Sequence, residues 1–431
     1  MAIISISDSQ VNGADQILVA DSSSRIPAKD GSQITILNAT NVASGTIASA
    51  RLDTGTTANK LVLLDGSGNL PAVDASLLTG IVSATISASD PTLSTNPSGG
   101  VGTEWNNSTS GAMYICTDAT AGENVWKNVG AGTDNIEPAK WYGPRGCWGG
   151  GEDGSTGSKK DVIDYITIST LGNATDFGNL LAARRAMGGA SGDGRGLFFG
   201  GGEPSQNVIQ YITIAVLGNA SDFGDLTSAQ ENCGGLSSGV RGVRIGGAAQ
   251  VTLDYVTIAT TGNATDFGDT LNGNSGAAGL SNGTYGLIAG GNYPNTNNIE
   301  KITVATTGNA VDWADLTTTP NRTTSYSSDT RGIWSGGYSV TAQNAYSNVI
   351  EYVTIATQAN ATDFGDLLAT WAGASGVSDA IKGVAYGGWK PGGGGAQNLQ
   401  MQYVTIATTG NSLDFGDSSH LRQSMPGPVS G

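Results

Sequence analysis

The chain is poor in positive charge and nearly devoid of histidine. Its 431 residues include 20 Lys and Arg against 36 Asp and Glu, a net charge of −16, and one histidine, His420. Nucleic acid and anionic membranes are also negatively charged, so both are disfavoured as partners. One histidine is too few for a copper centre built on imidazoles, and no positioned nucleophile accompanies it. We therefore expect a surface histidine, no catalytic residues and no cofactor.

Cysteine is scarce, and long apolar runs are absent. Cys116, Cys147 and Cys233 are an odd number without metal-ligand spacing, so they should be small packing residues rather than disulfide partners or metal ligands. No apolar run approaches the roughly 20 residues of a membrane-spanning helix. Residues 1–5 lack the basic and apolar stretches of a secretion signal. These absences predict synthesis in a cytoplasm and no membrane insertion.

Aromatic residues are missing from the start of the chain, because the first one is Trp105. Residues 1–85 mix short apolar and polar runs punctuated by glycine, as in 60–70. Without large side chains this segment cannot build a substantial core of its own. It is either disordered or buries its apolar stripe against copies of itself. The regular strand-and-turn punctuation favours the second alternative.

Glycine is abundant, with 66 residues, and it marks a six-fold repeat in the last two-thirds of the chain. Each repeat has a Gly-x3-Gly-Gly segment, a strand led by an aromatic residue, and an Asp-Phe-Gly-type turn. The first glycines are Gly146, Gly196, Gly242, Gly286, Gly332 and Gly383. The strand leads are Tyr165, Tyr211, Tyr255, Lys301, Tyr352 and Tyr403. The turn aspartates are Asp176, Asp222, Asp266, Asp312, Asp363 and Asp414.

The spacing of these features is nearly constant. A strand lead stands 11 residues before its aspartate (176 − 165), and an aspartate stands 20 before the next repeat's first glycine (196 − 176). A glycine-rich, strand-rich period of 44–51 residues is typical of a β-propeller with four-stranded blades. We therefore predict an all-β protein in which residues 141–431 form a six-bladed propeller.

The two ends of this region complement each other. Twenty residues after Asp414 would be position 434, but the last repeat ends at Gly431. Residues 144–151 supply the matching continuation at the other end. We expect the C-terminal strand to pair with the strand near Trp148, because this pairing closes the ring and removes the two sheet edges that an open array would leave unpaired.

Residues 86–140 are predicted to be a small β-hairpin collar followed by a linker. Residues 105–116 have the pattern of two strands around a Ser-Gly turn. We expect Trp126 to pack against Trp105 or Tyr114. The last ten residues have the composition of a linker into the repeats.

Two stretches of the first region, residues 36–52 and 64–81, resemble shaft repeats of trimeric bacteriophage tail fibres. The collar resembles small β-hairpin modules of phage fibres, and the Asp-Phe-Gly turn resembles a repeat of phage structural proteins. The resemblance implies a virion protein, of the tail fibre or capsid surface, that is made in the host cytoplasm. Residues 1–85 would attach to other virion proteins and form a homotrimeric β shaft.

The repeats also resemble kelch-type propellers, because an apolar strand ends at Gly-Gly. The match departs from that family at position 217, six residues after Tyr211, where leucine stands in place of the kelch tryptophan.

Asp176-Phe177-Gly178 matches a kinase magnesium motif by letter. It recurs in near copies in every repeat, without a lysine-bearing strand or a catalytic loop, so we interpret it as a turn. Asn173 and Asp176 would satisfy local backbone donors. Gly178 would take positive φ, and Phe177 would pack between blades.

Acidic residues leave two chemical alternatives open. The second acid of the turns permits a calcium hypothesis, although the dense carboxylate pattern of calcium loops is absent. These acids are Asp225, Asp269, Asp315, Asp366 and Asp417, with Asn179 in the first repeat. Paired carboxylates could hydrolyse glycans. The candidate acids are scattered along the chain and include Glu152, Asp153, Glu203, Glu300 and Glu351.

The part of each repeat between Gly-Gly and the strand lead varies most, with 14, 10, 8, 10, 15 and 15 residues. Equivalent propeller loops leave by one face, and loops on a rigid scaffold often carry recognition. The longest belong to repeats five, six and one, which become neighbours in a closed ring. The receptor-binding candidates on them are Asp153, Lys159, Lys160, Tyr338, Gln343, Tyr346, Trp389 and Lys390. The alternative is unselected drift, which the glycine run at 392–395 favours.

These patterns predict a phage fibre whose propeller head binds a glycan or protein of the host surface without catalysis. The alternatives are a structural fibre that decorates the capsid and, third, a polysaccharide depolymerase. Exposed Trp and Tyr suit the first interpretation, because they stack on sugar faces and anchor protein contacts.

Overall fold

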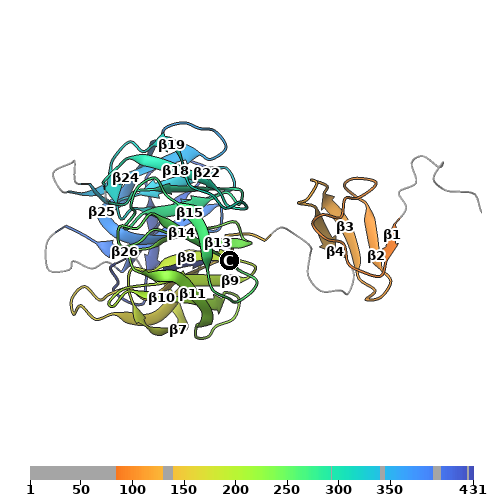
Figure 1. The fold of residues 1–431 in the computed structure, drawn as a ribbon, viewed down its shortest axis with the longest axis horizontal. Coiled ribbons are helices and arrows are strands. Elements are labelled where there is room, and N and C mark those ends of the chain that lie inside the picture. The colour runs from red at the N-terminus through yellow and green to blue at the C-terminus, as the bar shows by residue number, and fades with distance from the viewer. Residues whose placement is uncertain (1–83, 130–138, 293, 340–344, 392–398, 425–426) are drawn as a thin grey trace, which may run out of the picture. The chain divides into compact units, whose positions relative to one another are not determined.

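The computed structural model describes residues 84–129, 139–292, 294–339, 345–391, 399–424 and 427–431. The predicted shaft therefore lies almost wholly outside the described residues, as does the candidate Gln343. Every regular element is a β-strand, and most sheets are four-stranded and antiparallel (Figure 1). The all-β class is thus confirmed. Within the part of the chain that the structure describes, no helix is long and apolar enough to cross a membrane.

Residues 84–129 form one small sheet. Its strands are β1 (Thr85–Ser87), β2 (Glu104–Asn107), β3 (Met113–Asp118) and β4 (Val125–Asn128), in that order. β1 is parallel to β2, and the other pairs are antiparallel. The rings of Trp105 and Trp126 pack edge to face at 5.8 Å, as expected from the sequence. Tyr114 and Cys116 complete this core.

Residues 139–431 fold into consecutive four-stranded sheets, which we number 1 to 6 in chain order. Sheet 1 contains β29 (Gly427–Ser430), β5 (Arg145–Gly149), β6 (Lys160–Thr167) and β7 (Thr175–Arg184). Sheet 2 contains β8 (Gly188–Gly192), β9 (Arg195–Phe199), β10 (Gln206–Thr213) and β11 (Ser221–Gln230). Sheet 3 contains β12 (Gly234–Ser237), β13 (Arg241–Ile245), β14 (Thr252–Thr257) and β15 (Thr265–Asp269). Sheet 4 contains β16 (Ala278–Ser281), β17 (Tyr285–Ala289), β18 (Asn298–Thr303) and β19 (Val311–Asp315).

Sheets 5 and 6 share one long strand, β25 (Thr362–Ser378). Its first half closes sheet 5, and its second half opens sheet 6. Sheet 5 also contains β21 (Thr324–Ser327), β22 (Arg331–Ser335) and β24 (Ala345–Thr354). Sheet 6 also contains β26 (Lys382–Trp389), β27 (Gln400–Thr405) and β28 (Leu413–Asp417). Two short strands, β20 (Pro320–Asn321) and β23 (Tyr338–Ser339), extend the sheet beside β24.

Sheet 1 is completed by the C-terminal strand. β29 pairs antiparallel with β5, and the register joins Val429 to Cys147 and Gly427 to Gly149. Gly431, directly after β29, exchanges two backbone hydrogen bonds of 3.1 and 3.0 Å with Arg145 of β5. The predicted pairing near Trp148 is therefore confirmed.

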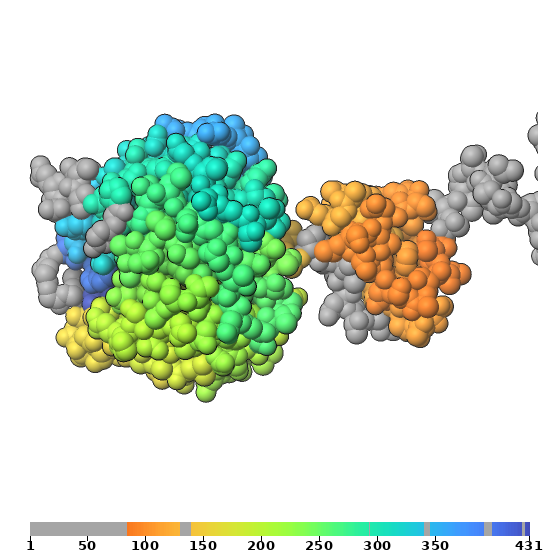
Figure 2. All heavy atoms as spheres, in the orientation of Figure 1, coloured from red at the N-terminus to blue at the C-terminus, as the bar shows by residue number. Residues whose placement is uncertain are grey.

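The first strands of the six sheets are neighbours in cyclic order. β29 contacts β8, and the contacts continue through β12, β16 and β21 to β25, which again contacts β29. All six line one central cavity of about 110 Å³. Their backbones approach so closely that a Cβ on Gly189 would lie 1.9 Å from the Pro428 carbonyl oxygen. In Figure 2, the atoms of sheets 2 to 4 follow one another across the surface without a gap.

Serines near the ends of these inner strands fix their relative level and direction. The Ser237 hydroxyl donates to the Ser191 carbonyl at 2.6 Å. Ser327 repeats this contact to Ser281 at 2.7 Å, and Ser378 repeats it to Ser327 at 2.6 Å. Equivalent strands therefore run the same way, and equivalent connections emerge on the same side. We call the side with the turns between first and second strands the turn face, and the side with the connections between second and third strands the loop face.

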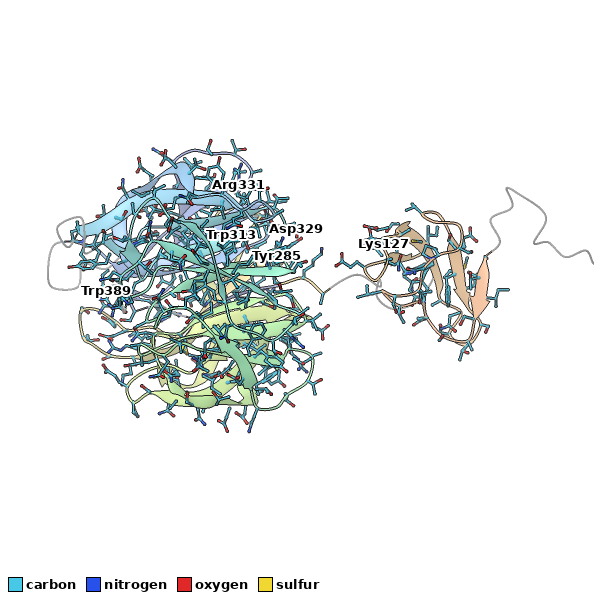
Figure 3. All side chains as sticks on the ribbon, turned by 45° about the horizontal axis from the view of Figure 1, so that its top comes forward. Lys127, Tyr285, Trp313, Asp329, Arg331 and Trp389 are labelled. Carbon is cyan, nitrogen blue, oxygen red and sulfur yellow. The ribbon has the colours of Figure 1, made fainter. Side chains whose placement is uncertain are left out.

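The segment that leads into sheet 1 lies against the turn face. The Trp141 ring packs on Gly283, where a Cβ would come within 2.5 Å of it, and it lines the central cavity. The Tyr142 hydroxyl donates to the Asp329 carboxylate at 3.3 Å, and burial raises the pKa of Tyr142 to about 12. Figure 3 shows Asp329 on one side of these sheets and Trp389 at the opposite edge.

One asparagine in each sheet reaches the outer strand of the preceding sheet. The Asn173 side-chain oxygen accepts the Asp417 N–H at 2.9 Å. The equivalent acceptor–donor pairs, at 3.0–3.1 Å, are Asn219–Asn179, Asn263–Asp225, Asn309–Asp269, Asn360–Asp315 and Asn411–Asp366. The expectation that Asn173 bonds locally was wrong, because its loop packs on the neighbouring sheet. Gly178 has a φ of 148°, and Phe177 packs among residues of sheets 1 and 2, both as expected.

A cation stacks on a tyrosine in every sheet. The charged groups lie 4.3–5.4 Å from the ring centroids. The pairs are Arg145–Tyr165, Arg195–Tyr211, Arg241–Tyr255, Lys301–Tyr285, Arg331–Tyr352 and Lys382–Tyr403. Sheet 4 reverses the order, with tyrosine on the second strand and lysine on the third. This reversal explains why Lys301 breaks the tyrosine pattern in the sequence.

Candidate recognition face

The loop face carries connections of unequal length. The repeat tyrosines lie near the ends of their strands rather than at the beginnings, because β6 already starts at Lys160 and includes Tyr165. The connections between second and third strands are therefore residues 150–159, 200–205, 246–251, 290–297, 336–344 and 390–399. The longest again belong to sheets 1, 5 and 6. These three sheets are consecutive in the cyclic order of the inner strands.

The sheet 1 candidates form a self-contained group. Asp153 accepts the N–H and hydroxyl of Ser155 at 3.0 and 2.6 Å, and it lies 3.4 Å from the Lys160 ammonium. These hydrogen bonds, chiefly that of the Ser155 hydroxyl, hold the pKa of Asp153 well below its usual range. Lys159 pairs with Glu203 of sheet 2 at 3.7 Å. Asp153 therefore shapes its own hairpin, and the two lysines already have acidic partners.

Arg185 brings together two acids that are distant in the sequence. Its guanidinium pairs with Glu152 through one nitrogen and with Glu203 through the other. Gln423 adds a hydrogen bond of 3.3 Å to Glu152, and a backbone bridge joins the same two residues. Glu152 and Glu203 were scattered candidates for glycan hydrolysis. The structure instead pairs both carboxylates with one arginine.

The aromatic candidates lie on sheets 5 and 6. Tyr338 and Tyr346 face each other across β23 and β24, with ring centroids 5.4 Å apart and planes at 76°. Trp389 ends β26, packs on Gly373 and carries the Arg322 guanidinium at 4.9 Å over its ring. Tyr338, Tyr346 and Trp389 are all half-buried. Each is therefore partly accessible at the surface.

Arg322 was missed in the sequence. It belongs to the connection between sheets 4 and 5, directly after Asn321, which pairs with Tyr338. It stands five residues before the serine of its inner strand, where the other repeats have Ala186, Asn232, Gly276, Gly373 and Met425. Aligning the repeats at that serine would have singled it out as the one cation at this position.

Charge differs between parts of the loop face. The connections of sheets 1 and 2 mix Lys159, Lys160 and Arg185 with the acids Glu152, Asp153, Glu203 and Glu231. Among the described residues of the connections in sheets 4 to 6, Arg322 and Lys390 are cations and no acid is present. Burial lowers the pKa of Lys390. This sector is therefore locally positive on a chain whose net charge is −16.

The single histidine does meet a serine and an aspartate. His420 Nδ1 lies 2.5 Å from the Ser419 hydroxyl oxygen and 3.7 Å from Asp164 Oδ2, and the Ser419 hydroxyl also bonds Asp164 Oδ1 at 2.5 Å. A catalytic triad needs the serine and the aspartate on opposite ring nitrogens. Here both address Nδ1, and Asp164 is held in a buried ion pair by Arg422 at 2.9 Å. The arrangement fastens sheet 6 to sheet 1 and has no relay geometry.

The residue before each strand lead (tyrosine in five repeats and Lys301 in the fourth) is buried and polar, another pattern missed in the sequence. These residues are Asp164, Gln210, Asp254, Glu300, Glu351 and Gln402. Glu300 accepts the Leu271 N–H at 2.8 Å, and Glu351 accepts the Thr318 hydroxyl at 3.1 Å, so each bonds the preceding sheet. Burial raises the pKa of both glutamates. Their positions suit joints between sheets rather than hydrolysis of an external glycan.

The calcium hypothesis gains no geometric support from the turns. Among the residues described, no three His, Cys, Asp or Glu side chains are grouped so that they could hold a metal ion. The three thiols are buried and unpaired, and burial raises the pKa of Cys147 and Cys233 to about 12. Such thiols are poor metal ligands and nucleophiles, because they stay protonated.

No protein-family model matches this sequence, and no curated protein matches it.

Proposed function

We propose that residues 141–431 are a six-bladed β-propeller head and that its loop face binds the surface of a host cell. Support for the ring comes from the β29–β5 pairing, the cyclic contacts of the inner strands, and the cavity they all line. The same contacts between successive sheets recur from sheet 6 to sheet 1, as in the Asn173–Asp417 bond. A ring closed by both chain ends lacks the two unpaired edges that an open array of sheets would leave.

One observation carries the functional part: the two faces are used differently. The turn face holds Trp141 and Tyr142 of the leading segment. The loop face carries the unequal connections, with half-buried aromatic side chains and unbalanced charge on sheets 5 and 6. Variable loops on a rigid scaffold are a common basis of recognition. The head would thus be joined to the rest of the chain at its turn face and would bind the host surface with its loop face.

The shaft and its partners belong to the same proposal. Residues 1–85 would form a homotrimeric β shaft that attaches to other virion proteins, as the resemblance to phage tail fibres implies. Three heads on one shaft would multiply weak individual contacts through avidity.

The experiment compares the two faces of the full-length chain. A bulky maleimide conjugate would be attached to Ser158→Cys on the loop face or to Val240→Cys on the turn face, both exposed positions. Adhesion to a panel of bacterial cells should be blocked by the loop-face conjugate and kept by the turn-face conjugate. Equal adhesion by both conjugates would contradict binding through the loop face, and failure of the unmodified chain to bind any surface would favour a structural fibre.

Enzymatic depolymerisation is the weakest of the alternatives. Glu152 and Glu203 are bound to Arg185, and Glu300 and Glu351 are buried between sheets. A hydrolase needs one carboxyl group that can donate a proton beside an accessible sugar. Incubation of surface polysaccharide with the chain should leave its length unchanged.

A further inference from the structure

Five of the six junctions between successive sheets have a cation clamp on the turn face. We use this name for a cation that stacks on the tyrosine of its own sheet and donates to a backbone carbonyl of the next sheet, just after that sheet's third strand. The donor–acceptor distances are 2.7–3.3 Å. A charged donor strengthens the hydrogen bond, so each clamp ties two sheets together. The pairs are Arg145–Ile214, Arg195–Ile258, Arg241–Val304, Arg331–Ile406 and Lys382–Ser169.

The junction between sheets 4 and 5 is the exception. Sheet 4 has Tyr285 at the start of its second strand, where the other sheets have arginine or lysine. Its cation, Lys301, lies on the third strand and stacks over the Tyr285 ring. Among the residues that the structure describes, the cation of sheet 4 therefore makes no equivalent bond to sheet 5. On the turn face, this junction has one tie fewer than the other five.

Residues 139–143, which we call the strap, cross the turn face at this junction. Trp141 packs on Gly283 of sheet 4, and the Tyr142 hydroxyl donates to the Asp329 carboxylate of sheet 5 at 3.3 Å. The Trp141 and Tyr142 rings pack edge to face on each other, with centroids 4.9 Å apart and planes at 88°. The two side chains therefore join sheet 4 to sheet 5 as one unit.

The turns beneath the strap fit it. A Cβ at Gly239 of sheet 3 would lie 2.2 Å from the Ala139 carbonyl oxygen, and one at Gly283 would lie 2.5 Å from the Trp141 ring. Glycine therefore occurs at the two turns on which the strap presses, and a carboxylate occurs at the turn to which Tyr142 donates. The residues at this turn position, two after the serine of the inner strand, are in sheets 2 to 6 Asp193, Gly239, Gly283, Asp329 and Ala380.

We propose that the strap is a lock for the junction between sheets 4 and 5 and takes the place of the missing cation clamp. It supplies what a cation supplies at the other junctions, namely a packed ring contact and a hydrogen bond to the next sheet. Release of the strap loosens this junction and leaves the clamped junctions closed. This lock goes beyond adhesion, because it makes closure of the head depend on the segment by which the chain enters it.

The readout is hydrogen exchange of the full chain, followed by mass spectrometry of peptides. Two backbone N–H groups bond across the locked junction: Ala361 donates to the Asp315 carbonyl at 2.8 Å, and Asp315 donates to the Asn360 side chain at 3.1 Å. Their counterparts between sheets 2 and 3 are the N–H groups of Ala264 and Asp225. The two pairs report separately on the locked junction and on a clamped one.

Two variants release the strap in different ways. Trp141→Ala removes its ring, and Gly283→Ala adds the Cβ that would clash with that ring, although sheet 6 has Ala380 at the same turn position. Either change should speed exchange at the junction of sheets 4 and 5 about ten-fold and leave the junction of sheets 2 and 3 within about two-fold of wild type. Tyr142→Phe, which removes only the hydroxyl, should have a smaller effect at the same junction.

The decisive background is the exchanged sheet 4, Tyr285→Arg with Lys301→Tyr, which places an arginine where the other sheets have their clamp. In this background, Trp141→Ala should speed exchange by no more than about two-fold, because the new clamp holds the junction. The matched control is Arg195→Gln, which removes the clamp between sheets 2 and 3. It should speed exchange at that junction equally with the strap intact or released.

Equal acceleration at both junctions in Trp141→Ala, or an undiminished effect in the exchanged background, would overturn the lock and leave the strap as ordinary packing. An absence of acceleration in both Trp141→Ala and Gly283→Ala would do the same. Adhesion to cells is measured separately, so a head that binds no surface would remove the proposed function without changing these exchange rates.

Discussion

At the scale of single residues, the cation–tyrosine pairs show how the repeats tolerate change. Five sheets place the cation on the second strand and the tyrosine on the third, whereas sheet 4 has Tyr285 and Lys301 in the opposite order (Tyr285 is labelled in Figure 3). The contact survives because a cation over a ring is favourable whichever strand supplies it. The pair, rather than either residue, is therefore the conserved physical unit within this chain.

Exchanging the two residues of sheet 4 tests this interpretation. Tyr285→Arg alone would place arginine beside Lys301, and Lys301→Tyr alone would leave two tyrosines without a cation. Each single variant should lose about 1 kcal/mol of unfolding free energy, and the double variant should recover most of it. Urea unfolding of all four proteins measures the coupling. Losses that simply add in the double variant would show that the pair does not interact.

Buried acids make the stability depend on pH in a direction that can be worked out. Burial raises the pKa of Glu300 above its ordinary value of 4.5, so the folded state binds its proton more tightly than the unfolded state. Stability should therefore fall as pH rises from about 4 towards the folded pKa and then level off. Each unit of the shift corresponds to about 1.4 kcal/mol.

Glu300→Gln should remove this loss. Gln210 and Gln402 occupy the same position and accept equivalent backbone N–H groups at 2.8 Å, so glutamine fits the site. The variant should be more stable than wild type at pH 7 and equally stable near pH 4, as measured by denaturant unfolding across pH. The contrasting change is Asp254→Asn, which strands the buried Arg244 and should cost about 3–5 kcal/mol. A Glu300→Gln variant that is less stable at pH 7 would refute the assignment.

At the scale of elements, the Asp-Phe-Gly turns join neighbouring sheets. A Cβ on Gly178 would lie 2.3 Å from the Gly218 carbonyl oxygen of sheet 2, and φ is 148°. Gly172 has a similar φ of 157°, but nothing would lie within 4 Å of its Cβ. Substitutions at the two glycines therefore distinguish the cost of a positive φ, which both share, from the cost of a clash with the next sheet, which only Gly178 would have.

Alanine substitutions at these two glycines should differ in cost. Gly172→Ala should lose about 1 kcal/mol from strained φ alone. Gly178→Ala should lose about 3 kcal/mol, because the neighbouring sheet must also move away. Thermal or urea unfolding compares the two. Equal losses would mean that the turns do not clamp adjacent sheets.

Repeat spacing predicted the strands, the turns and the C-terminal pairing, because each depends on a pattern that recurs six times. It did not locate the partner of Asn173. An asparagine that bonds within its own turn and one that bonds the neighbouring sheet give the same residue pattern in every repeat. Only the packing of the sheets distinguishes the two roles. The start of β6 was also misplaced, because its first residues, such as Lys160 and Asp161, lack the apolar or aromatic side chains that mark a strand.

The candidate site was predictable only in part. Loop length pointed to sheets 5, 6 and 1, and the structure has the same three longest connections. The contact of Arg322 with Trp389 was not found, because the two residues are 67 positions apart (389 − 322). The hydrogen bonds of Asp153 within its own hairpin were likewise invisible in the sequence, since an exposed acid and a turn-forming acid look alike.

At the scale of the whole molecule, the account depends on the meeting of the two chain ends in sheet 1. If β29 did not pair with β5, sheets 6 and 1 would stand at opposite ends of an open array instead of side by side. The long connections of sheets 5, 6 and 1 would then not lie next to one another. Val429 and Cys147 are register partners and belong to the same core cluster, so their side chains point the same way. Such partners have Cα atoms about 5.5 Å apart, a separation that a disulfide spans.

The most direct measurement is therefore cross-linking in Val429→Cys. After refolding under oxidising conditions, the account predicts an intramolecular disulfide between positions 147 and 429, seen as faster migration on a non-reducing gel and confirmed by peptide mass. The control that also carries Cys147→Ser should remain unlinked. A Val429→Cys chain that stays reduced, or that links to another chain instead, would contradict the closed ring.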